Sequence, residues 1–100
     1  SVTITNEATI VDISINNQDK DGYFMEMCIQ KGAYIEVNDT HYKLKKVRGI
    51  ALCPNTTKFS HVGETREFTL TFEAIPKGST SMSIVEPDEG GWRIYGIDLK

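Results

Sequence analysis

The sequence predicts an all-β domain, an immunoglobulin-like antiparallel β-sandwich of about seven to nine short strands. No window carries apolar residues at helical spacing over three turns, whereas β-branched and aromatic residues are frequent. Turn residues recur about every 8–12 residues. This spacing is typical of β-sandwiches and β-barrels. A small closed barrel is the alternative architecture.

Five strands separated by polar turns are expected in the first half of the chain. Ile10 breaks the alternation that Val11 and Ile13 set, so we expect a bulge or burial on both faces there. Asn38-Asp39 predicts a hairpin turn. The expected strands are Val2–Thr5, Ala8–Ile15, Tyr23–Gln30, Ala33–Val37 and Thr40–Val47. Ala33–Val37 is expected as an exposed edge strand that charged neighbours protect from pairing between chains.

The second half holds the clearest strand, Glu67–Glu73. Its alternation predicts Phe68, Leu70 and Phe72 inside, with the residues between them outside. The closing run is apolar in both phases, which predicts burial on both faces or a bend at Gly96. The other expected elements are a short apolar run at Arg48–Cys53, an irregular stretch at Thr56–Arg66, and strands at Ser81–Val85 and Trp92–Leu99.

Length and charge limit the function classes. A chain of 100 residues is expected to form one domain over residues 1–100, and 39% hydrophobic with 25% charged residues argues against disorder. The net charge of the chain is −3. The one basic cluster in the sequence is too sparse to form a nucleic-acid-binding surface. That cluster comprises Lys43, Lys45, Lys46 and Arg48. No apolar run is long enough to span a bilayer. Because Ser1 leads almost directly into a strand and Lys100 comes just after one, we expect a domain cut from a longer protein.

Cys28 and Cys53 match neither a CxxC motif nor a zinc-ligand spacing. Two separate, half-buried thiols are the favoured interpretation. A single structural disulfide, which fits an oxidising compartment, is the main alternative, and a catalytic thiol is a third.

The second part of the chain holds a set of short motifs in expected strands and turns. These are Tyr34–Val37, Tyr42–Leu44, Arg48–Ile50, Phe68–Glu73 with Ile75-Pro76, Ser83–Glu86 and Trp92–Ile97. Together they resemble a family of small exported β-sandwich domains from Bacteroidetes, which often precede a thioredoxin-like domain in thiol–disulfide oxidoreductases or occur in uncharacterised secreted proteins and lipoproteins. The resemblance implies an accessory role and not the redox activity, because that family's CxxC lies in the following domain and this chain has none.

Two polar loops are candidate cation sites. Asn17–Gly22 resembles the first half of a calcium loop, but Cys28 stands where the bidentate Glu is needed, so a polar hairpin loop is favoured. Glu86–Gly91 contains three carboxylates, and a solvated turn is favoured over a cation or basic-partner site. We therefore predict no metal-binding residue.

Catalytic groupings are not expected either. His41 and His61 have no acid or nucleophile at a recognisable spacing, and Ser60 lies in no GxSxG motif. Asn38 and Asn55 each begin an N-x-[ST] triplet in a predicted loop, a pattern that arises easily by chance. The aromatics that would form a carbohydrate platform are more simply core and corner residues. These are Tyr34, Tyr42, Phe59, Trp92 and Tyr95.

The sequence thus predicts a non-catalytic accessory or interaction module of an exported bacterial protein, with a carbohydrate-binding module as the alternative. A protein partner or neighbouring domain is expected, with no cofactor, nucleic acid or membrane span. The expected location is the periplasm, the cell surface or the medium. The sequence does not predict the ligand, the oligomeric state or the native residues after Lys100.

Overall fold

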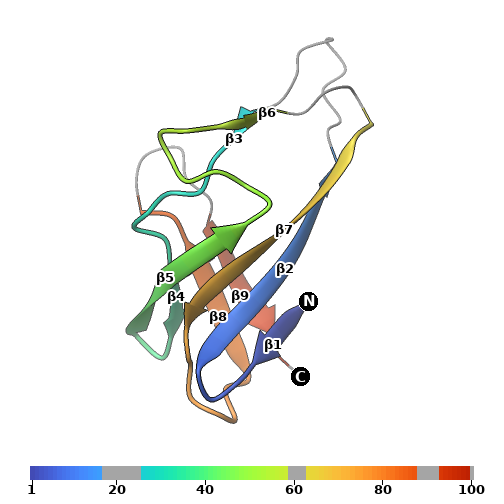
Figure 1. Cartoon of the computed structure of the whole chain (residues 1–100). Helices are drawn as coiled ribbons and strands as arrows, with labels where there is room; N and C mark the ends of the chain where they lie inside the picture. The colour runs from blue at the N-terminus through green and yellow to red at the C-terminus, as the bar shows by residue number, and fades with distance from the viewer. Residues whose placement is uncertain (17–25, 59–62, 88–92, 100) are drawn as a thin grey trace.

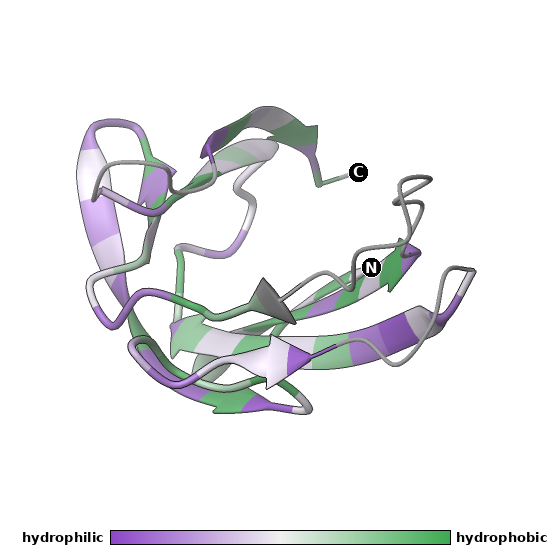
Figure 2. Cartoon of the chain, turned by 90° about the horizontal axis from the view of Figure 1, so that it is seen from above, coloured by the Kyte–Doolittle hydropathy of each residue, from purple (hydrophilic) through white to green (hydrophobic). Residues whose placement is uncertain are grey.

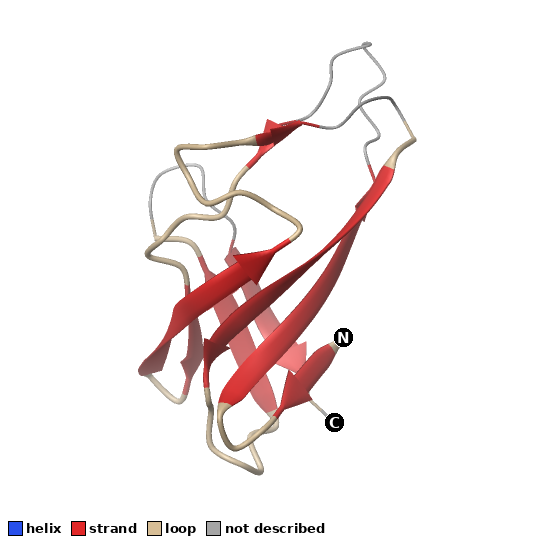
Figure 3. Cartoon of the chain, viewed as in Figure 1, coloured by secondary structure: helices blue, strands red, loops and turns tan. Residues whose placement is uncertain are grey.

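The computed structural model describes residues 1–16, 26–58, 63–87 and 93–99, and there it forms nine strands and no helix (Figures 1 and 3). Seven strands form one sheet in the order β1-β2-β7-β5-β4-β8-β9, and β3 pairs with β6. The strands are β1 (Val2–Ile4), β2 (Ala8–Asn16), β3 (Glu26–Met27), β4 (Tyr34–Val37), β5 (Thr40–Arg48), β6 (Thr57–Lys58), β7 (Thr65–Glu73), β8 (Ser81–Val85) and β9 (Arg93–Asp98). The predicted all-β antiparallel class is confirmed.

The seven-stranded sheet curls into a half-barrel (Figure 2). Its two edge strands, β1 and β9, come round to the same side of the molecule, where both chain ends also lie (Figures 1 and 2). The expected immunoglobulin-like sandwich is not confirmed, because the described strands form one curled sheet and a separate two-stranded ribbon. The described part is therefore intermediate between an open sheet and the closed barrel that is the alternative architecture.

The concave face of this sheet carries the core. Phe68, Leu70 and Phe72 of β7 are 4%, 1% and 0% exposed, as their alternation predicts. Met82 and Ile84 of β8 join them, as predicted. The other members of the buried cluster are Val11, Ile29, Ala33, Ile35, Val37 and Ile75. Burial of this face explains why the register of β7 is set so firmly, since a one-residue slip would turn all these side chains outward.

The bulges do not lie where the sequence suggests. β2 pairs with β7 from Ala8 to Asn16 without a register shift, so the bulge expected at Ile10 is absent. Ile10 is instead partly buried on the convex face, opposite Thr71, so the alternative of burial on both faces of β2 applies. Register shifts occur between Leu44 and Lys46 in β5, and between Met82 and Ile84 in the pairing of β8 with β9. The second shift lies at Gly96 (φ 67°), which confirms the expected bend, while β9 is largely exposed and not buried on both faces.

The hairpin is confirmed. Val37 pairs with Thr40, and Asn38 and Asp39 between them have φ of 49° and 67°, the left-handed pair that a tight two-residue hairpin turn requires. The expectation of an edge strand at Ala33–Val37 is wrong, because β4 lies between β5 and β8. Local alternation cannot reveal which strands become edges, since that depends on pairing between distant segments.

The expected strand Tyr23–Gln30 is observed only as β3, and residues 23–25 lie outside the described part. Arg48 ends β5, and the expected apolar run after it continues to Cys53 without becoming a sheet strand. In the described ranges no helix is long and apolar enough to cross a membrane.

Candidate functional site

A disulfide joins Cys28 and Cys53. Beside the disulfide, Ile29 and Leu52 form a parallel bridge. The Ile29 N–H donates to the Ala51 carbonyl at 2.9 Å, and the Cys53 N–H donates to the Ile29 carbonyl at 2.9 Å. Ile29 is 1% exposed and belongs to the core. The favoured interpretation of two separate thiols is therefore wrong, and the disulfide alternative is confirmed. The two cysteines are 25 residues apart in the sequence. No local pattern therefore shows that the fold brings them together.

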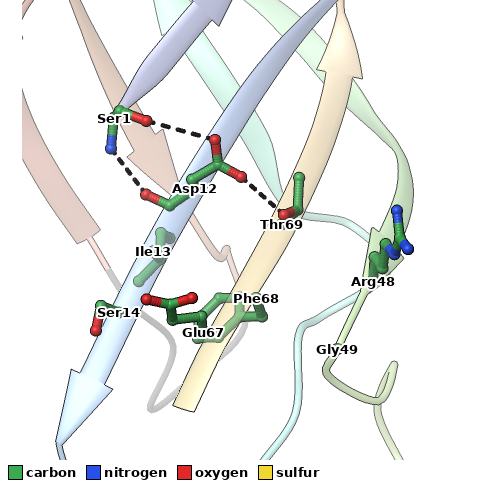
Figure 4. Close-up of a pocket in the computed structure, with 9 residues that line it drawn as sticks. All are labelled: Ser1, Asp12, Ile13, Ser14, Arg48, Gly49, Glu67, Phe68 and Thr69. Atoms are coloured by element: carbon green, nitrogen blue, oxygen red, sulfur yellow. Dashed lines mark hydrogen bonds between the residues drawn. The ribbon is translucent and has the colours of Figure 1, made fainter. Parts of the chain in front are cut away.

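A polar hollow of about 530 Å³ lies on the convex face (Figure 4). The register of three neighbouring strands aligns Asp12 of β2, Thr69 of β7 and Arg48 of β5. Thr69 Oγ1 donates to Asp12 Oδ1 at 2.8 Å, and the Arg48 side chain lies on the far side of Thr69 from Asp12 (Figure 4). Opposite charges thus flank a hydroxyl. The arrangement can hydrogen-bond a polar ligand, but among its described lining residues no buried polar group is directed into it.

The basic cluster of the sequence lies along β5, where all four of its side chains are exposed. Polar groups of neighbouring segments lie beside it: Lys43 N–H donates to Glu73 Oε1 at 2.8 Å, and Lys45 Nζ donates to the Glu7 carbonyl at 3.4 Å. The four basic side chains thus lie on a solvent-exposed surface of mixed charge.

In the described ranges, the large apolar side chains that are exposed both lie on the edge strand β9. Ile94 is 42% exposed and Tyr95 is 67% exposed. Ile94 lies opposite the buried Ile84, so it shares the concave face with the core. The signal for this site is present in the sequence, since apolar residues in both phases of Trp92–Leu99 do not fit a strand with one solvated face.

Glu86 fits neither interpretation of the acidic loop, the solvated turn or the site for a cation or basic partner. It is 3% exposed, and its Oε2 accepts a hydrogen bond from the Gln30 N–H at 2.7 Å. This carboxylate therefore fastens the segment before β4 to the end of β8, and is neither solvated nor open to a cation. Residues 88–91 of the same loop, and the whole of Asn17–Gly22, lie outside the described residues.

His41 is an exposed residue of the β4–β5 hairpin. Its Nε2 lies 3.1 Å from Glu36 Oε2, and its ring stacks on Tyr34 at a centroid distance of 4.0 Å. His61 and Ser60 lie outside the described residues. Across the described ranges, no group of three or more His, Cys, Asp or Glu side chains is placed to hold a metal ion.

The candidate aromatic platform is not assembled by the tyrosines that the structure describes. Tyr34 and Tyr42 point to opposite faces, because Tyr42 pairs with Ile35, the buried neighbour of Tyr34. Tyr95 lies on β9, two strands away from Tyr34. Phe59 and Trp92 lie outside the described residues. Asn38 and Asn55 of the N-x-[ST] triplets are both exposed.

Comparison with known proteins gives no relative: no family model, no curated protein and no solved structure matches the chain.

Proposed function

We propose that this domain is a non-catalytic interaction module of an exported bacterial protein, and that it binds its partner or neighbouring domain through the edge strand β9. The observation that carries the proposal is the exposure of Ile94 and Tyr95 on that edge. Large apolar side chains at a sheet edge favour association, and natural proteins usually cover or charge such edges. An accessory role beside a thioredoxin-like domain, which the sequence motifs imply, is part of the same proposal.

The Cys28–Cys53 disulfide supports the exported location. Disulfides persist in the periplasm and in secreted proteins and are rare in the reducing cytosol. We infer a periplasmic, cell-surface or secreted domain. Production of the chain with and without an export signal tests this: the exported form should contain no free thiol, and a folded, fully reduced exported form would contradict it.

The interaction role is tested with a thioredoxin-like domain, the neighbour that the sequence motifs imply. The isotope-labelled chain is titrated with that domain, and amide signals of β9 are expected to shift while those of the Asn38-Asp39 turn stay unchanged. A glycan panel is run in parallel. Shifts produced by a sugar alone would replace the proposal with the carbohydrate-binding alternative, and reduction of a protein disulfide that depends on Cys28 and Cys53 would make the domain an enzyme.

A further inference from the structure

We propose that the half-barrel is completed by an eighth strand, an extended segment of a partner protein that inserts between β1 and β9 and pairs antiparallel with both. The inference rests on the proposed interaction function and names the class of partner and the site it uses.

The directions of the strands are the first argument. Every neighbouring pair in the seven-stranded sheet is antiparallel. Direction therefore alternates along the order, and the two edges, β1 and β9, run the same way. Joining them directly would create a parallel pair, whereas one inserted strand antiparallel to both keeps the alternation. The completed barrel would have about eight strands, the number at which side chains just fill the interior of a barrel.

The free main-chain groups of β1 are the second argument. Ser1 and Asp12 exchange hydrogen bonds at 2.9 and 2.8 Å, and Thr5 N–H donates to the Ala8 carbonyl at 2.9 Å. Bonded residues alternate with unbonded ones along an antiparallel edge. The N–H and C=O groups of Val2 and Ile4 consequently point away from β2, toward the open edge. An added strand would satisfy them, as in β-strand addition to an exposed sheet edge.

The side chains beside the two edges are the third argument. Val2 pairs with the buried Val11, and Ile4 pairs with Thr9, which is 0% exposed. On the other edge Ile94 pairs with Ile84 and Ile97 with Met82. All four edge side chains thus lie on the core face and remain partly accessible. A strand with apolar residues at alternate positions would cover them.

The occupant is a single segment and not a second copy of the domain. An edge strand of another copy already pairs on one side, so it can join β1 or β9 but not both. An isolated extended segment has both sides free. The charges of β9 specify its ends: Arg93 and Asp98 pair with Val85 and Ser81, on the face away from the core. An antiparallel partner strand is complementary when a basic residue opposes Asp98, near its N-terminus, and an acidic residue opposes Arg93.

A synthetic peptide tests the inference. Acetyl-Thr-Lys-Val-Thr-Ile-Glu-Thr-amide places Val and Ile inward, opposite Ile97 and Ile94, and its charges opposite Asp98 and Arg93. Its central Thr spans the bulge of β9, as one residue of β8 does between Met82 and Ile84. With the whole chain isotope-labelled and the peptide near saturation, hydrogen exchange at the Val2 and Ile4 amides is expected to slow by about tenfold or more. Two control peptides, one with Ser replacing Val and Ile and one with Lys and Glu exchanged, should give weaker protection.

Matched variants locate the effect. Ile94→Lys places a charge on the core face of the edge and should weaken binding by about tenfold or more, whereas Thr40→Lys, in the β4–β5 hairpin away from both edges, should change it by less than about threefold. Both side chains are exposed, so both variants should fold. Equal losses in the two variants would contradict insertion at this site.

Two other outcomes overturn the inference. If the folded chain shows no protection with any peptide, the edges do not accept a strand. If Val2 and Ile4 are already protected without peptide and light scattering shows a dimer, the occupant is a second copy. In either case a shift of β9 signals by the thioredoxin-like domain would leave the broader interaction function standing, so the two proposals fail separately.

Discussion

Thr9 shows how a single polar side chain can connect two segments of this fold. It is 0% exposed, and its Oγ1 donates to the Glu73 carbonyl at 3.1 Å and accepts from the Ile75 N–H at 3.2 Å. Ile75 is itself 3% exposed. The hydroxyl therefore hydrogen-bonds two main-chain groups, one at the end of β7 and one just past it, and the second of these bonds is buried. Its alternation with Val11 predicts burial of this position, but not the two hydrogen bonds.

Thr9→Val should lower the free energy of unfolding by about 1–3 kcal/mol, because it preserves shape while leaving the buried Ile75 N–H without its acceptor. Urea unfolding measures the change. Thr3→Val, at an exposed strand position, is the control and should stay within about 0.5 kcal/mol of the parent. Equal effects of the two substitutions would show that the hydroxyl of Thr9 contributes nothing specific.

At the scale of an element, the β4–β5 hairpin is the local structure that the sequence predicts best. Asn-Asp is one of the few dipeptides that accept positive φ at both positions, and the flanking alternation sets the strands. The register of β7 is equally predictable, since Phe68, Leu70 and Phe72 alternate with polar residues. By contrast, the bulge in β5 between Leu44 and Lys46 has no local signal, because it adjusts β5 to the pairing with β7.

Asp39 offers a test of that turn. Its φ of 67° suits glycine, so Asp39→Gly should be neutral or stabilising by up to about 1 kcal/mol, while Asp39→Ala should destabilise by about 1–2 kcal/mol. Thermal unfolding followed by circular dichroism compares the two. A more stable alanine variant than glycine variant would mean that this turn does not hold a left-handed residue.

At the scale of the whole molecule, the Cys28–Cys53 disulfide ties the segment after β3 to the segment that precedes β6. It closes a loop of 25 residues that includes β4 and β5. Through the neighbouring Ile29, this region also contributes to the core of the main sheet. The link consequently adds a covalent bond between two segments that the β3–β6 pair and the backbone hydrogen bonds of Ile29 also hold together.

Replacing both cysteines, Cys28→Ser with Cys53→Ser, should cost about 3 kcal/mol of stability, since the unfolded chain regains the freedom of the loop. Equilibrium denaturation measures the loss. The parent protein, unfolded without reductant, should show no thiol reactive to a maleimide, and the same protein after reduction should match the double variant. A parent that reacts with two equivalents of the reagent would refute the link.

The sequence by itself determined the all-β class, the turn at Asn38-Asp39 and the inward residues of β7 and β8, and it offered the bend at Gly96 as one of two alternatives. These features depend on side-chain period and backbone preference, which act over a few residues. Only the tertiary structure decided the disulfide, the buried role of Glu86, and the sheet order that makes β1 and β9 the edges of a half-barrel. Each of these depends on which distant segments pair, and that choice is made by the burial of the whole concave face and not by any local pattern.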